Sequence, residues 1–210
     1  MAVHIVLEEI GEPFERELVS SRGQREGADT ATEAWRRMNP KGRIPALSGV
    51  PGTIGGADSL LTEVTAILVY LARQHPAAAL LPTDPAAEAR CIEWMNWLAS
   101  NVHAMSYGQI WRSIRYADDS GCLPAIETKG RENLGNQHAF IESVLGDGRD
   151  WAVAGGFSIV DPYLLVFYQW GQRVGFDMRR DYPLWSALTA KLLQRPAVRK
   201  VLAYEQVMIQ

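Results

Sequence analysis

Long apolar runs, clustered cysteines and an excess of positive charge are all missing from this chain of 210 residues. No apolar run approaches the roughly 18 residues that a membrane-spanning helix needs, so no membrane partner is expected. The net charge of −3 provides no basic field, which argues against nucleic acid as a partner. The two cysteines, Cys91 and Cys122, form neither a ligand-spaced cluster nor a Cys-x-x-Cys pair. A metal centre and thiol–disulfide exchange are therefore poor hypotheses.

The start of the chain also lacks the marks of export. Met1-Ala2-Val3-His4 contains no basic segment and no small-residue cleavage site. With so few cysteines, this predicts a reduced, cytoplasmic protein. A hydrophobic content of 47% and a charged content of 21% are typical of a globular chain. At this length the chain can bury the core of one large or two small domains.

The first 75 residues mix helical and strand patterns. Apolar residues recur at helical spacing before Gly11, whereas the segment after it alternates apolar and charged side chains, as a half-buried strand does. The expected elements are a helix at 2–10, a strand at 14–19, a loop at 20–32, a helix at 33–38, strands at 43–48 and 57–61, and a helix capped by Thr62 that runs to 74. This order is α-β-α-β-β-α.

Composition changes at residues 76–85, where prolines and an alanine run indicate a linker. From there the pattern is helical to the end of the chain. Long helices are expected at 88–116 and 125–145. A third helix begins at residues 158–161 and runs to about 174, and shorter helices are expected at 183–193 and 197–208. Ser158-Ile159-Val160-Asp161 is a capping-box pattern with Asp161 in place of the usual glutamate. The sequence thus predicts an α/β domain at 1–75 and an all-helical domain at 86–210.

An unusual strand start occurs within residues 39–47, at Ile44-Pro45. Proline cannot donate to a sheet ladder, so a strand rarely begins this way. If the Ile44–Pro45 bond is cis, the chain turns sharply and leaves the N–H and C=O of Ile44 free to pair with an extended peptide. The alternative is an ordinary trans turn proline, since only about 5–6% of X–Pro bonds are cis.

Glu63 lies at the first turn of the helix expected after Thr62. Free N–H groups and the dipole at a helix N-terminus favour anions. The alternative is a glutamate that stabilises the first turn without any ligand.

His103 follows Asn96 by seven residues, which is two turns of α-helix, and Ser100 lies between them. This spacing predicts that the three side chains share one face. A lone histidine is more commonly a hydrogen-bonded core or interface residue. Tyr107 and Trp111, farther along a similar face, are candidates for the wall of an apolar pocket, although most aromatic residues here have core spacing.

The small α/β part, the linker and the helical part together resemble the cytosolic glutathione transferases, and the bacterial beta class in particular. Four stretches carry the resemblance in the right order: residues 39–47, 61–63, 91–103 and 156–164. Together they extend over most of the chain, and the ordered set is specific where each alone is weak. The resemblance implies a thioredoxin-like N-terminal domain, a helical C-terminal domain and glutathione as co-substrate, with no metal.

By this resemblance, the backbone of Ile44, exposed by a cis Pro45, pairs with the cysteine part of glutathione. Glu63 binds the ammonium group of the γ-glutamyl end, and the N–H of Val64 takes its carboxylate.

Asn96, Ser100 and His103 correspond to positions that line the cleft between the domains, and His103 approaches the bound thiol. An imidazole there can polarise a water or stabilise a thiolate. Relatives of this kind are homodimers, and a role in detoxification is expected.

The sequence departs from the family at its start. A first strand and a catalytic loop, which carries the serine, cysteine or tyrosine beside the glutathione sulfur, precede the helix that here begins near Ala2. We expect the true start to lie upstream of Met1; the alternative is a rearranged domain. Ala104 also stands where relatives often have lysine.

Two functions are consistent with these residues. The first is a transferase that conjugates the thiol of glutathione to a small hydrophobic electrophile. The second is a transferase-like binding or interaction module with weak or no catalysis, which is expected if the sequence is complete.

Overall fold

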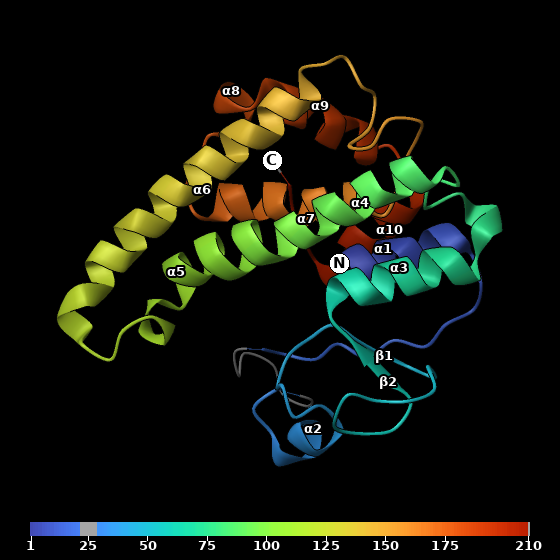
Figure 1. The fold of residues 1–210 in the computed structure, drawn as a ribbon, viewed down its shortest axis with the longest axis horizontal. Helices are drawn as coiled ribbons and strands as arrows, with labels where there is room; N and C mark the ends of the chain where they lie inside the picture. Colours follow the sequence, from blue (N-terminus) through green and yellow to red (C-terminus); the bar gives the residue numbers. More distant parts are fainter. Residues whose placement is uncertain (22–28, 210) are drawn as a thin grey trace.

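The computed structural model describes residues 1–21 and 29–209, and it divides into a small mixed part and a larger helical part (Figure 1). The elements of the mixed part are α1 (Ala2–Ile10), α2 (Glu33–Met38), β1 (Ala46–Ser48), β2 (Leu60–Thr62) and α3 (Val64–Gln74). The elements that follow are η1 (Pro76–Ala78), α4 (Pro85–Trp97), η2 (Leu98–Tyr107), α5 (Gly108–Trp111), η3 (Ser113–Arg115), η4 (Ser120–Cys122), α6 (Leu123–Leu145), α7 (Val160–Arg173), α8 (Met178–Asp181), α9 (Pro183–Leu192) and α10 (Pro196–Glu205). The expected mixed-then-helical order is confirmed, while the exact domain boundaries stay a prediction.

The sheet of the described chain consists of β1 and β2, which pair antiparallel with Leu47 opposite Leu61. Both strands are shorter than predicted. α3 packs against them on one side and against α1 on the other. The helix expected at 33–38 is present as α2, and Thr32 caps it, because the hydroxyl of Thr32 accepts a hydrogen bond from the N–H of Trp35 at 3.2 Å.

The prediction of a strand at residues 14–19 is wrong. This segment has no regular secondary structure and no ladder partner among the residues that the structure describes. Its side chains instead pack on helices: the ring of Phe14 lies 5.7 Å from that of His4, and the guanidinium of Arg16 lies 3.8 Å from the centroid of the Tyr204 ring. Alternation along a segment specifies its two faces, but a strand also needs a neighbour. Residues 22–28 of the predicted loop lie outside the described residues.

The long helix expected at 88–116 begins at Pro85 and ends at Trp111, and its middle is not α-helical. Residues 98–107 form a π-helix, η2, in which the hydrogen bonds reach from i to i+5, as between the N–H of Gly108 and the carbonyl of His103. α6 packs along η2 and α5 (Figure 1). The π-helical segment changes which side chains of residues 98–107 face the rest of the molecule.

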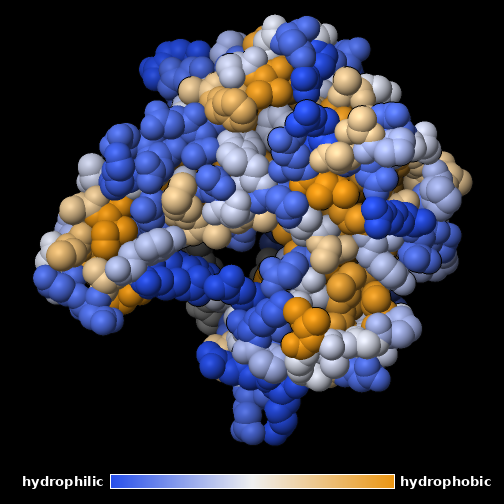
Figure 2. Space-filling model, in the orientation of Figure 1, coloured by the Kyte–Doolittle hydropathy of each residue, from blue (hydrophilic) through white to orange (hydrophobic). Residues whose placement is uncertain are grey.

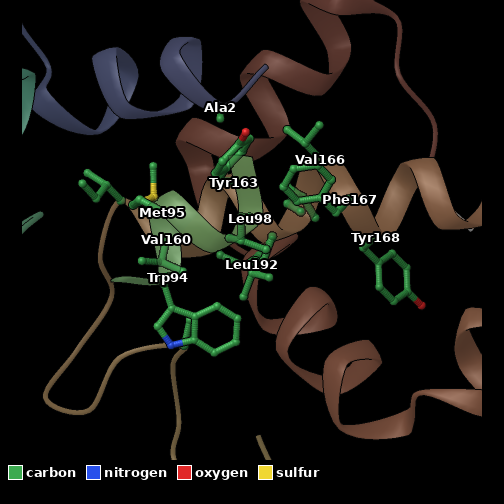
Figure 3. Close-up of a cluster of buried hydrophobic side chains, with 14 of the residues drawn as sticks. Ala2, Trp94, Met95, Leu98, Val160, Tyr163, Val166, Phe167, Tyr168 and Leu192 are labelled. Carbon is green, nitrogen blue, oxygen red and sulfur yellow. The ribbon is translucent and has the colours of Figure 1, made fainter. Parts of the chain in front are cut away.

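α7 is the central helix of the structure, and it is buried on nearly every side. Side chains from α1, α4, η2 and α7 meet in one cluster that includes Ala2, Leu98 and Tyr163 (Figure 3). The carboxylate of Asp161 is fully buried at the first turn and accepts hydrogen bonds from the N–H groups of Ala152 and Ser158, at 2.9 and 2.8 Å. One half of the predicted capping box is therefore present, the contact from the Ser158 N–H to Asp161, whereas the N-cap residue of α7 is Ile159 and not Ser158.

Across residues 1–21 and 29–209, none of the helices has both the length and the apolar character that crossing a bilayer requires.

Candidate functional site

A cleft of about 670 Å³ lies between the mixed part and the helical part. One wall comes from the loop before β1 and from the junction of β2 with α3, and the opposite wall comes from η2, α5, η3 and α7. The space-filling view shows a hollow between these two parts, with strongly hydrophilic side chains at its edge (Figure 2). The cleft brings together residues that are far apart in the sequence.

Ile44 and Pro45 lie on the first wall. The bond between them is cis, as predicted. Ile44 is 42% exposed, and among the described residues its N–H and C=O have no hydrogen-bond partner. The loop is held from behind by the buried Asn39, whose amide donates to the carbonyl of Arg43 at 2.8 Å. A rigid loop therefore presents one donor and one acceptor to the cleft.

The start of α3 lies next to this loop and differs from the prediction in its cap. Thr62 ends β2, and Glu63 is the N-cap residue, with φ of 72°. No side chain caps the helix, so the N–H groups of Val64 and Thr65, at the first turn, are available on the cleft wall. Lys41 donates to Glu63 Oε1 at 2.7 Å. A helix N-terminus and a carboxylate with a cationic partner thus stand beside the free backbone of Ile44.

Of the three residues that the sequence places on one face, His103 lines the cleft in the structure, whereas Asn96 and Ser100 do not. Asn96 and Ser100 are exposed outside the cleft, and the hydroxyl of Ser100 donates to the carbonyl of Asn96 at 2.8 Å. Their spacing assumed 3.6 residues per turn, whereas a π-helix turns through fewer degrees per residue. The π segment instead places Ala99, His103 and Tyr107 on the cleft face.

The environment of His103 lowers its pKa below the usual 6.5. Although much of its side chain is accessible, it opens into the cleft, where the walls desolvate the charged form of the ring. Desolvation is the largest cause, and the positive charges of Arg43, Arg112 and Arg115 add to it. The imidazole is therefore neutral at pH 7 and can accept a hydrogen bond.

Tyr107, Trp111 and Trp170 form the apolar wall beyond His103. Their rings lie 4.9 to 5.3 Å apart between centroids. The hydroxyl of Tyr107 donates to the carbonyl of Phe167 at 3.0 Å, which fixes the ring against α7. Tyr107 and Trp111, for which the sequence allowed either a core or a pocket-wall position, thus pack against α7 and also line the cleft.

With this geometry in place, comparison with known proteins gives a consistent result. Residues 1–74 match the model of the glutathione S-transferase N-terminal domain, and residues 126–196 match that of the C-terminal domain. A sphingomonad glutathione S-transferase, solved in complex with glutathione, is 32% identical, with a TM-score of 0.78 over 99% of this chain and 94% of that one. The chain belongs to the glutathione S-transferase family.

Other relatives agree with this membership. Glutathione S-transferase GstA of Escherichia coli O157:H7 is 28% identical over 206 residues, covering 98% of this chain and 93% of that protein. The bacterial beta class glutathione S-transferase of Sphingomonas chungbukensis is 27% identical with a TM-score of 0.75, over 99% of this chain and 94% of that one. A glutathione transferase homologue from Sulfitobacter, solved with bound glutathione, is 27% identical with a TM-score of 0.80, over 99% and 93%. The thioredoxin-like N-terminal domain and the helical C-terminal domain are thereby confirmed.

Arg115, Tyr163 and Arg173 are among the residues of this transferase cleft that the sequence analysis missed. A signal existed for two of them, because Tyr163, Val166, Trp170 and Arg173 follow the 3-4-3 spacing of one helical face. The hydroxyl of Tyr163 is buried and has no hydrogen-bond partner among the described residues. Burial is the main cause that raises its pKa, so the group stays a neutral donor.

Neither cysteine belongs to the cleft: Cys91 is buried and Cys122 is exposed. Burial raises the pKa of Cys91 to about 12, so this thiol is protonated at neutral pH. Within the part of the chain that the structure describes, no group of histidine, cysteine and acidic side chains could hold a metal ion.

Proposed function

We propose that this chain binds glutathione in the cleft and conjugates its thiol to a small hydrophobic electrophile. The observation that carries the proposal is the unpaired backbone of Ile44, which lies beside the uncapped N-terminus of α3. A tripeptide needs such a strand-like edge for its middle residue and an anion site for its terminal carboxylate. The bound glutathione in the relatives from Sulfitobacter and the sphingomonad supports the same ligand here.

In this arrangement the N–H and C=O of Ile44 pair with the cysteine residue of glutathione. The γ-glutamyl carboxylate accepts from the N–H groups of Val64 and Thr65, where the helix dipole favours negative charge. Glu63 binds the adjacent ammonium group and shares its carboxylate with Lys41. Asn96 and Ser100, being outside the cleft, have no place in this binding mode.

His103 is the proposed catalytic residue. A thiol with a pKa near 8.5 is mostly protonated at neutral pH, so the site must favour its anion. The neutral imidazole accepts a hydrogen bond from the thiol or from a water beside it, and the positive charge of Arg43 favours the thiolate. The thiol proton passes to solvent, the sulfur forms a bond to the electrophilic carbon, and the leaving group departs with the electron pair of its bond.

A glutathione-binding module without turnover is the second candidate. It is favoured by the lowered pKa of His103, which makes the imidazole a weak base.

Retention on immobilised glutathione, followed by turnover of 1-chloro-2,4-dinitrobenzene, separates the two. We expect retention, and Glu63→Gln to weaken it about tenfold because a charge-assisted hydrogen bond is lost. Glu33→Gln is the matched control, because Glu33 is also an exposed carboxylate paired with a cation but lies on α2, outside the cleft. Retention without turnover supports the module, and absence of retention contradicts both candidates.

We also propose that the chain forms a homodimer in the cytoplasm and serves detoxification, as the family resemblance implies. Light scattering of the purified protein tests the dimer, and a monomer mass would contradict it.

A further inference from the structure

The cleft is positively charged although the whole chain is acidic. Among the described residues, five cationic side chains and two carboxylates line it, in a chain whose net charge is −3. Both carboxylates already have partners, since Glu63 pairs with Lys41 at 2.7 Å and Glu205 with His4 at 3.0 Å. The arginines of the cleft therefore set the sign of its electrostatic field.

Two of these arginines, Arg115 and Arg173, lie on the helical wall and not on the wall that offers the backbone of Ile44. Neither forms an ion pair with a carboxylate among residues 1–21 and 29–209. Arg173 ends α7 and Arg115 ends η3, and both side chains belong to exposed residues. Unpaired guanidinium groups at the edge of a cleft suit an anionic ligand with planar geometry, such as a carboxylate.

Arg173 stands directly beside the apolar wall, and Arg115 lines the same cleft. The guanidinium of Arg173 lies 5.8 Å from the centroid of the Trp111 ring, which contacts Tyr107 and Trp170. The positive charge of Arg115 is also among the causes that lower the pKa of His103, after burial, Arg43 and Arg112. A ligand that fills this end meets aromatic faces and positive charge together.

We propose that the second substrate is an aromatic electrophile that carries a carboxylate, with its ring against Tyr107, Trp111 and Trp170 and its carboxylate on Arg115 and Arg173. This inference rests on the proposed function and names the substrate class of the same site. It differs from a purely apolar electrophile pocket, for which unpaired arginines would be unfavourable neighbours. Arg112 also lines this wall and adds positive charge.

A matched pair of aryl halides tests the charge alone: 4-chloro-3,5-dinitrobenzoate and its methyl ester. In both, the glutathione sulfur bonds to the ring carbon that bears chlorine, the carbon–chlorine bond breaks, chloride leaves with the bonding pair, and the thiol proton passes to solvent. Dividing each kcat/KM by the uncatalysed rate constant removes the difference in intrinsic reactivity. The ratio of acid to ester then reports recognition of the carboxylate.

We expect the corrected ratio to exceed one and to fall as salt is added, because the carboxylate site is partly exposed. Arg115→Gln and Arg173→Gln should each lower the ratio about threefold to fivefold, and the double variant about tenfold. Arg179→Gln is the control, since Arg179 is equally exposed but lies on α8, outside the cleft. A ratio that does not change in the double variant overturns the proposal.

A second measurement does not depend on glutathione or on turnover. Quenching of tryptophan fluorescence gives the affinity for unreactive 3,5-dinitrobenzoate and for its methyl ester, because Trp111 and Trp170 form the wall. Tighter binding of the acid that is lost in the double variant supports the proposal even if conjugation fails. If the double variant instead loses retention on glutathione and keeps its preference for the acid, the arginines bind the tripeptide and the inference is wrong.

Discussion

Replacing Asp161 by alanine tests how the structure holds α7 in place. Its carboxylate is completely buried and accepts from the N–H of Ala152, the N–H of Ser158 and, at 3.3 Å, the hydroxyl of Ser158. Asp161→Ala leaves both N–H groups without an acceptor in a site that water does not reach. Each orphaned donor costs about 1–3 kcal/mol, so the unfolding free energy should fall by about 2–6 kcal/mol.

The size of this loss depends on pH in a definite direction. Burial raises the pKa of Asp161 from 3.8 to about 6, although its hydrogen bonds oppose the rise. The folded state therefore holds a proton that the unfolded state releases, so this group's contribution to stability is greatest at low pH and is lost as pH rises through 6. From pH 4.5 to the folded-state pKa of about 6 the unfolding free energy falls by about 2 kcal/mol, because these roughly 1.5 pH units contribute about 1.36 kcal/mol each. Between that pKa and pH 7.5 the group is ionised in both states and little more is lost.

Urea unfolding of wild type and Asp161→Ala at pH 4.5 and 7.5 measures both effects. The destabilisation should be about 2 kcal/mol smaller at pH 7.5, because the variant lacks the buried carboxylate. Asp84→Ala is the control: Asp84 caps α4 by accepting from Ala87 at 2.8 Å on the surface, and its removal should cost about 1 kcal/mol. A larger loss for Asp161→Ala at pH 7.5 than at pH 4.5 would refute the reasoning, since the carboxylate would then be ionised and stabilised by its donors.

Two further predictions concern the cleft. Arg43→Gln should raise the pKa of His103, because the charge of Arg43 is the largest cause of the lowered pKa after burial. An NMR titration of the imidazole Hε1 measures this pKa, and an unchanged or lower value contradicts the prediction. Tyr163→Phe should leave the melting temperature unchanged or raise it, because it removes a buried hydroxyl that has no partner among the described residues. A drop of several degrees would mean that the hydroxyl does have a partner.

The features that the sequence predicts well depend on residues close together in the chain. The cis bond at Pro45 and the contact of Asp161 with the Ser158 N–H each depend on a few consecutive residues, and the structure contains both. The start of α3 is equally local, although its N-cap is Glu63 and not Thr62.

The features that the sequence does not predict depend on distant residues or on a change of helical period. Residues 14–19 alternate as a strand does, but whether they form one depends on a neighbour that alternation cannot supply. The face shared by His103 and Tyr107 follows from the π-helical period of η2, which apolar spacing alone does not indicate. Placing Asn96 and Ser100 in the cleft failed for this reason.

α7 connects the stability of the molecule to the recognition of the second substrate. Its first turn carries the buried Asp161, and its cleft face carries Tyr163 and Trp170 before it ends at Arg173. The contacts proposed for glutathione lie instead on Ile44, Glu63 and Val64, which α7 does not contain. A change that shifts α7 without unfolding the chain should therefore alter the choice of electrophile more than the affinity for glutathione. Electrophile choice and glutathione affinity can therefore change independently, because α7 carries one set of contacts and the loop before β1 with the start of α3 carries the other.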